Sequence, residues 1–211
     1  MRTMLLLGLS LAPLALANMD SGGVHSPMHG PPGRRIAIRV VNSPVVPVKS
    51  LAQAEKIAGQ ILANAAVEVI WVDCGTAALG QMDNPCAQDR GPTDFWLHML
   101  KRNPQNFYGD VTGFAMLTPL WKDGECYAGV SYPMVEAAAK SLDVEVSHIL
   151  GATLAHEIGH LLLGAHSHFP TGVMCPRFGR QQLRMVARGE LLFTPEQAAR
   201  IRAEVARRVA R

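Results

Sequence analysis

The stretch that most constrains the fold is a strongly apolar segment, Val144–Leu163, which carries two histidines and a glutamate. Its apolar residues recur at helical spacing, so we predict a helix over the whole segment. In that helix His156 and His160 are four residues apart and share one face, with Cβ atoms about 5–6 Å apart. Burying these histidines and Glu157 among leucines is costly unless they have partners. The segment therefore predicts a central helix that carries a metal site.

The two histidines and the glutamate have the chemistry of a zinc site. Neutral imidazoles leave Zn²⁺ strongly electrophilic, so that the pKa of a bound water falls from 15.7 toward about 7. Glu157 lies beside the histidine pair and is the expected general base, which takes a proton from that water and later gives it to the leaving group. Two more histidines follow the helix. We expect one Zn²⁺ per chain, held by His156, His160 and a further ligand.

The segment from His156 to Pro176 resembles the zinc-binding and Met-turn segment of the metzincin metallopeptidases, especially those of the matrixin type. In that family a third histidine lies ten positions after the first, and a later methionine forms a turn beneath the metal. His166 and Met174 match those two positions without a gap. The resemblance implies a zinc-dependent peptidase with Met174 in the Met-turn. Simple core filling is the alternative role of this methionine.

One residue of the motif departs from the family pattern. The helix-ending glycine of the family falls at Leu163, whereas the available glycine, Gly164, is one position later. A helix that is one residue longer would return the chain to the metal at His168 instead of His166. This version of the motif resembles a group of uncharacterised bacterial exported proteins with HExxH motifs, in which the later histidine recurs. We therefore favour His168 as the third ligand and keep His166 as the alternative.

The resemblance also implies where a substrate would bind. In metzincins the strand that precedes the metal helix is a sheet edge that pairs with extended substrate. Cys126–Tyr132 matches this strand by position. Tyr132 could assist oxyanion stabilisation there, but we favour a packing role for it. The implied partner is a peptide or protein substrate.

The N-terminus has the features of an export signal. Arg2 precedes an apolar run, Met4–Leu14, and Ala15-Leu16-Ala17 supplies the small-x-small pattern that signal peptidase reads. The run is shorter than the roughly 20 residues of a membrane-spanning helix, so we expect no stable membrane insertion after cleavage. We therefore predict a signal peptide over residues 1–17 and a secreted or periplasmic protein.

The rest of the chain predicts one domain behind a short leader. Residues 18–33 are rich in Gly, Pro, His and Met without apolar periodicity, which is typical of a flexible segment. Residues 34–211 are long enough to form one metzincin-like catalytic domain with a sizeable core. The oligomeric state stays open.

Export changes how the four cysteines are interpreted, because thiols that reach a periplasm or the outside are usually oxidised. Four cysteines allow three pairings. We favour a disulfide between Cys74 and Cys86, because these two bracket one loop rich in Gly, Asn and Pro. A zinc site made of cysteines is the alternative, but the chain has no C-x-x-C pair and the histidines offer the better metal site.

Hydrophobic patterns predict an α/β fold, and the resemblance to metzincins implies that it is of the zincin-like α+β kind. Alternating β-branched residues indicate strands, and apolar residues three and four apart indicate helices. The expected strands are Arg35–Val41, Val67–Val72, Phe95–Leu100, Val111–Leu117 and Cys126–Ser131, and the other expected helices are Ser50–Ala65, Met134–Ser141 and Thr194–Arg207. The opening strand-helix-strand order implies a parallel pair. We expect a twisted mixed sheet with two packed helices, the active-site helix and a small C-terminal helical part.

These features predict an exported zinc-dependent endopeptidase, which hydrolyses peptide bonds by metal-activated water with Glu157 as general base. One alternative is a zinc amidase that acts on cell-wall or small amide substrates. Another is a non-catalytic zinc-binding module, which Glu157 disfavours because structural zinc sites are closed by four protein ligands and need no base. The formal net charge of +3 is too small to indicate a nucleic-acid partner.

Overall fold

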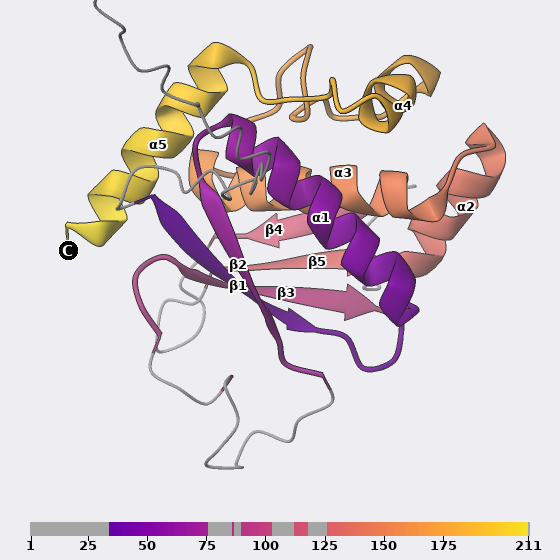
Figure 1. Cartoon of the computed structure of the whole chain (residues 1–211), viewed down its shortest axis with the longest axis horizontal. Coiled ribbons are helices and arrows are strands. Elements are labelled where there is room, and N and C mark those ends of the chain that lie inside the picture. Colours follow the sequence, from indigo (N-terminus) through magenta and orange to yellow (C-terminus); the bar gives the residue numbers. More distant parts are fainter. Residues whose placement is uncertain (1–33, 76–85, 87–89, 103–111, 118–125, 211) are drawn as a thin grey trace, which may run out of the picture.

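The computed structural model describes residues 34–75, 86, 90–102, 112–117 and 126–210. The predicted signal peptide and leader lie outside these residues, as does most of the loop between β2 and β3. The described elements, in chain order, are β1 (Arg35–Val41), α1 (Val48–Asn64), β2 (Glu68–Asp73), β3 (Asp94–Leu100), β4 (Gly113–Met116), β5 (Tyr127–Ser131), α2 (Tyr132–Leu142), α3 (Val146–Leu163), α4 (Arg180–Ala187) and α5 (Pro195–Val209). They form the expected mixed α/β fold (Figure 1).

The strands form one mixed sheet in the order β2-β1-β3-β5-β4. The first four strands of this order are parallel, and β4 alone runs antiparallel to its neighbour β5. The predicted parallel pair at the start of the chain is confirmed, with Ile38 opposite Trp71. The reversed strand β4 therefore forms one edge of the described sheet.

The expectation that Cys126–Tyr132 forms a sheet edge is wrong. The strand in this segment, β5, pairs with β3 on one side and with β4 on the other. Tyr132 does not belong to it, because this residue begins helix α2. Sequence order misled the prediction: the strand that comes last before the helices does not have to be outermost in the sheet.

One face of the sheet carries the hydrophobic core. Alternate residues of β1 and β3 are almost fully buried there, among them Ile36, Ile38, Phe95 and Leu97. Helices α1 and α3 contact each other and lie on the same side of the sheet (Figure 1). Helix α3 also contacts β4 and β5, so that it passes next to the edge of the sheet. The central helix is thus placed between the sheet edge and the C-terminal helices.

Helix α3 is buried on all sides over most of its length, from Ile149 to Leu162. Glycine normally destabilises a helix interior, but two glycines are needed here for close packing. A Cβ at Gly151 would lie 2.7 Å from the Cβ of Ile57 in α1. A Cβ at Gly159 would overlap the sulfur of Met174. The helix is therefore closely packed at two levels, against α1 at Gly151 and against Met174 at Gly159, which lies between the two histidines.

Cys74 and Cys86 form a disulfide, with their Cα atoms 5.7 Å apart. This agrees with the predicted pairing across the loop after β2. Cys126 and Cys175 are free thiols and half-buried. In the described part of the chain, no helix is both long and apolar enough to cross a membrane.

Candidate metal centre

The end of α3 determines which histidines can meet. The helix continues through Leu163 and stops at Gly164, whose φ of 104° is accessible to glycine but rarely to other residues. The amide of Gly164 still donates to the carbonyl oxygen of His160, at 2.9 Å. The helix is thus one residue longer than the matrixin spacing requires, as the position of the glycine predicts.

Three histidines converge beyond this helix end. The Nε2 atom of His160 lies 3.0 Å from Nε2 of His156 and 3.1 Å from Nε2 of His168. In the described part of the chain, these three residues are the group that could hold a metal ion, and His166 is not among them. His166 is exposed in the same loop. The structure therefore brings together the two helical histidines and the later of the two loop histidines.

The outer nitrogens of the helical histidines have hydrogen-bond acceptors. Nδ1 of His156 lies 2.8 Å from the carbonyl oxygen of Val173. Nδ1 of His160 lies 3.2 Å from the carbonyl oxygen of Gly164 and 3.1 Å from Oγ of Ser167, whose hydroxyl donates to that same carbonyl. Because a carbonyl can only accept, both Nδ1 atoms carry the hydrogen. Both Nε2 atoms are therefore left as lone-pair donors that face each other.

This arrangement fits a tetrahedral zinc site. Lone pairs 3.0 Å apart repel unless a cation lies between them. Zn–N bonds of about 2.0–2.1 Å at tetrahedral angles place ligand nitrogens about 3.3–3.4 Å apart. Burial lowers the pKa of His156 to about 4 and also lowers that of His160, which favours the neutral imidazoles that bind metal. The donor set of three neutral imidazoles supports zinc as the cofactor.

Glu157 is buried beside the histidines and is only 4% exposed. Burial raises its pKa to about 8. Its Oε2 atom has no hydrogen-bond partner in the described part of the chain. A buried carboxyl oxygen without a partner is costly to a fold and is a common sign of a functional site. A divalent cation held by the histidines would favour the charged form of Glu157 by Coulomb attraction.

Met174 lies directly against the metal-site helix. Its side chain is fully buried and its sulfur contacts the backbone of Gly159, between the two helical histidines. Its carbonyl oxygen accepts a hydrogen bond from the amide of Phe169, which follows the third histidine. The methionine thus contacts both the metal-site helix and the loop that carries His168. This position is compatible with both a Met-turn and core filling.

Tyr132 is buried in the hydrophobic core at the first turn of α2. This location agrees with the packing role that we favoured for it. Phe178 is a neighbour of the metal site that the sequence did not indicate, because its ring stands edge-on to His156 with centroids 5.7 Å apart. Ser167 was not indicated either, although its place directly before His168 is the kind of signal that could have suggested it.

Comparison with known proteins places this geometry in a fold family. No protein-family model matches the sequence, and no curated protein is detectably similar to it. In structure, the chain is similar to archaemetzincin from Methanopyrus kandleri, with a TM-score of 0.54, 18% identity, and coverage of 83% of this chain and 98% of the other. The chain has a zinc metallopeptidase fold.

Two further solved structures share this metallopeptidase fold. A zinc-dependent peptidase from Methanocorpusculum labreanum has a TM-score of 0.52 and 20% identity, with coverage of 78% of this chain and 99% of the other. Metalloproteinase-II from Bacteroides fragilis has a TM-score of 0.52 and 14% identity. The match covers 84% of this chain but only 55% of the longer Bacteroides protein. At these identities the likeness concerns the fold.

Proposed function

We propose that this metallopeptidase-fold chain is an exported zinc-dependent endopeptidase. One observation carries the proposal: the buried carboxyl of Glu157, whose Oε2 atom has no hydrogen-bond partner among the described residues, follows directly on a histidine whose ring nitrogen converges with two others. A structural zinc site needs a fourth protein ligand and no base. Three histidines with a neighbouring acid are instead the composition of an open, hydrolytic zinc site. His156, His160 and His168 would hold the metal.

The protein side of the reaction is proton transfer by Glu157. Zinc bound here would act as a Lewis acid and lower the pKa of water. Glu157 would take a proton from the attacking water and deliver it to the leaving amine. A general acid–base group works best when its pKa is near the working pH. Burial raises the pKa of Glu157, and a cation held by the histidines would lower it again toward that range. The hydrogen bonds from Nδ1 of His156 and His160 would keep both rings in the metal-binding orientation.

The edge strand β4 is the proposed binding site for substrate backbone. One side of β4 pairs with β5, and its other side is the edge of the described sheet. An extended peptide can add to such an edge through backbone hydrogen bonds. Helix α3 contacts β4, and the side chain of Glu157 lies against Gly113 at the start of this strand. A peptide on β4 would therefore pass close to the proposed base.

Export is proposed from two independent features. Residues 1–17 have the charge, apolar run and small-residue pattern of a signal peptide. The disulfide between Cys74 and Cys86 is of a kind that persists in oxidising compartments. Recovery of the protein from the periplasm or medium, with Asn18 as its first residue, would support this; a cytoplasmic protein that retains Met1 would contradict it.

Two alternatives remain distinguishable by experiment. An amidase for cell-wall or small amide substrates would use the same zinc and Glu157, but would leave peptide libraries intact. A non-catalytic zinc-binding module would bind zinc without any hydrolysis that depends on Glu157. The sheet edge at β4 favours an extended peptide over a small amide.

The decisive experiment compares the parent with Glu157→Gln in metal content and in hydrolysis of casein and a peptide library. Glutamine is nearly isosteric but cannot accept the proton, so we expect one zinc per chain in both proteins and a rate about 10²–10⁴-fold lower in the variant. Zinc without Glu157-dependent hydrolysis of any peptide would reject the peptidase in favour of one of the alternatives. A folded protein that binds no metal would reject all three.

A further inference from the structure

The side chain of Glu157 rests against a residue that has no side chain. A Cβ at Gly113, the first residue of β4, would lie 2.6 Å from Oε1 of Glu157, 2.8 Å from its Cγ and 2.9 Å from its Cδ. All three distances are shorter than any normal van der Waals contact between such atoms. The space that a side chain would occupy at position 113 is thus filled by the carboxyl group of Glu157.

The backbone conformation at position 113 does not require a glycine. The described glycines with positive φ are Gly75, Gly164, Gly172 and Gly189, and Gly113 is not one of them. A glycine within a strand weakens it and often marks a close approach by another group. Here the approaching group is a buried carboxyl, which indicates that the glycine serves the position of Glu157 and not the shape of β4.

Neighbouring threonines hold the strand and the helix together beside this contact. Oγ1 of Thr153, one helical turn before Glu157, lies 3.4 Å from Oγ1 of Thr112, directly before Gly113. Helix α3 is buried around both residues, so it has little room to move away from β4. An added methyl group at position 113 would therefore displace the flexible end of Glu157 before it displaced either backbone.

We propose that Gly113 is a positioning residue: the missing side chain on the edge strand determines where the Glu157 carboxylate stands relative to the metal histidines. The inference rests on the proposed function, in which β4 also binds substrate backbone. One strand would then set the place of both the base and the scissile bond. Relative placement of reacting groups is sensitive, because an error of about 1 Å can lower a rate on the order of 10²-fold.

The test is Gly113→Ala in the zinc-loaded, full-length mature protein. We expect kcat to fall about 10- to 100-fold, with KM and zinc affinity changed by no more than about twofold, because the substitution moves the base but neither the ligands nor the substrate edge. A kcat within about twofold of the parent would overturn the proposal. So would a rise in KM and a loss of zinc affinity as large as the loss in kcat, because this would indicate a general disturbance of the sheet.

Gly129→Ala is the matched control. Gly129 pairs with Phe114 across β4 and β5, and its Cβ would lie 2.5 Å from Cζ of that phenylalanine, away from Glu157. The two substitutions add the same methyl group to adjacent rungs of the same strand pair. We expect Gly129→Ala to lower the melting temperature but to leave kcat of the folded protein within about twofold. An equal loss of kcat in both variants would contradict a specific role for Gly113.

Two further experiments, one in the Glu157→Asp variant and one spectroscopic, separate this inference from the proposed function. In Glu157→Asp the shorter side chain leaves room for the methyl group, so Gly113→Ala should lower the residual rate less than it lowers the parent rate.

Independently of activity, the ¹³C signal of the Glu157 carboxyl carbon, assigned with Glu157→Gln, should shift in Gly113→Ala and stay in place in Gly129→Ala. A shift without peptidase activity in the parent would reject the function but keep the positioning role; an unchanged signal would reject the positioning role.

Discussion

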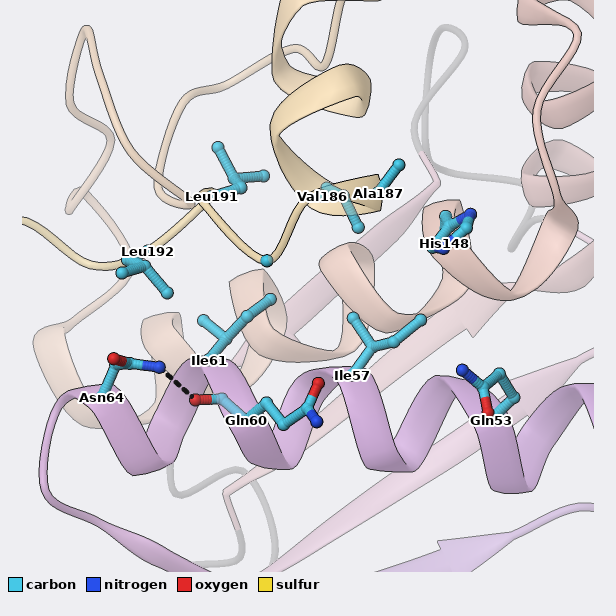
Figure 2. A pocket seen from close by; sticks show the side chains of 11 residues that line it. Gln53, Ile57, Gln60, Ile61, Asn64, His148, Val186, Ala187, Leu191 and Leu192 are labelled. Carbon is cyan, nitrogen blue, oxygen red and sulfur yellow. Dashed lines mark hydrogen bonds between the residues drawn. The ribbon is translucent and has the colours of Figure 1, made fainter.

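The metal centre and the groove beside α1 differ in chemistry although both are places where a ligand could bind. The groove has a volume of about 480 Å³ and lies between α1 and the segment around the end of α4 (Figure 2). It is lined by aliphatic side chains such as Ile57 and Ile61, by amides such as Gln60, and by His148. None of the described residues that line it carries a carboxyl group. Its volume alone is within the range of known ligand-binding pockets.

The metal centre is identified by polar groups that are buried without enough polar partners. The ring nitrogens of its three histidines converge, and Glu157 has a buried oxygen without a hydrogen-bond partner in the described residues. Such groups cost stability unless a ligand or a reaction uses them. Among the described residues that line the groove none has a buried side-chain atom without a partner: its amides, Gln53, Gln60 and Asn64, are exposed, and His148 is half-buried. In this comparison, buried polar groups without partners are a better indication of a functional site than the volume of a groove.

The largest expected effect separates the two loop histidines. His168→Ala should lower zinc affinity by at least about 10³-fold, because it removes one of three converging nitrogens. His166→Ala is the matched control, two residues away and exposed, and should bind zinc within about twofold of the parent. Competition with a chromogenic chelator measures both. If His166→Ala lost the zinc instead, the ligand geometry described above would be wrong.

A smaller effect is expected at Ser167, which supports the metal centre without binding the metal. Its hydroxyl bridges Nδ1 of His160 and the carbonyl oxygen of Gly164. Loss of such a supporting hydrogen bond typically costs 10- to 100-fold in metal affinity, so we expect about that loss in Ser167→Ala. Ser167→Thr keeps the hydroxyl and should retain most of the affinity. Equal affinities for the parent and the alanine variant would assign Ser167 to packing.

Glu55 tests whether a shifted pKa alone marks function. Its pKa is raised to about 7, first by burial and then by the nearby charge of Asp73, but it belongs to neither region. A raised folded pKa contributes stability that is complete below the unfolded value of 4.5 and is lost as the pH rises through about 7. Because solvent screens this half-buried group, we expect Glu55→Gln to gain only about 1 kcal/mol over the parent between pH 4.5 and pH 8.

Urea unfolding of the zinc-loaded proteins at both pH values measures this difference. Zinc affinity and hydrolysis should be the same in the parent and in Glu55→Gln. A loss of hydrolysis in the variant would show that Glu55 takes part in function. A raised pKa would then mark a functional carboxyl at Glu55 as well as at Glu157.

The smallest effect is expected in the groove. Gln60→Ala together with His148→Ala should change zinc affinity and hydrolysis by less than about twofold. One path could break this expectation: the carbonyl of Leu192, which lines the groove, accepts from the amide of Val173, whose own carbonyl accepts from His156. A loss of more than about tenfold in zinc affinity would show that the groove and the metal centre are coupled along this path.

Local sequence patterns predicted the elements that are long and strongly periodic. The strand at Arg35–Val41 has the predicted bounds, and α3 ends at Leu163 as predicted. The short helix α4 was missed, because its eight residues bury only Leu183 and Val186 and so show too little periodicity. Gln182, which reaches back to the amide of Gly179, was an available capping signal for this helix.

The sequence by itself determined the helical pair His156 and His160 with Glu157 beside them, because spacing along one helix fixes which side chains share a face. Only the tertiary structure decided that His168 joins them, that β4 and not β5 is the sheet edge, and that Glu157 lies against Gly113. These contacts join segments that are apart in the chain. Their geometry depends on where a loop returns and in which order strands pair, and local patterns contain neither.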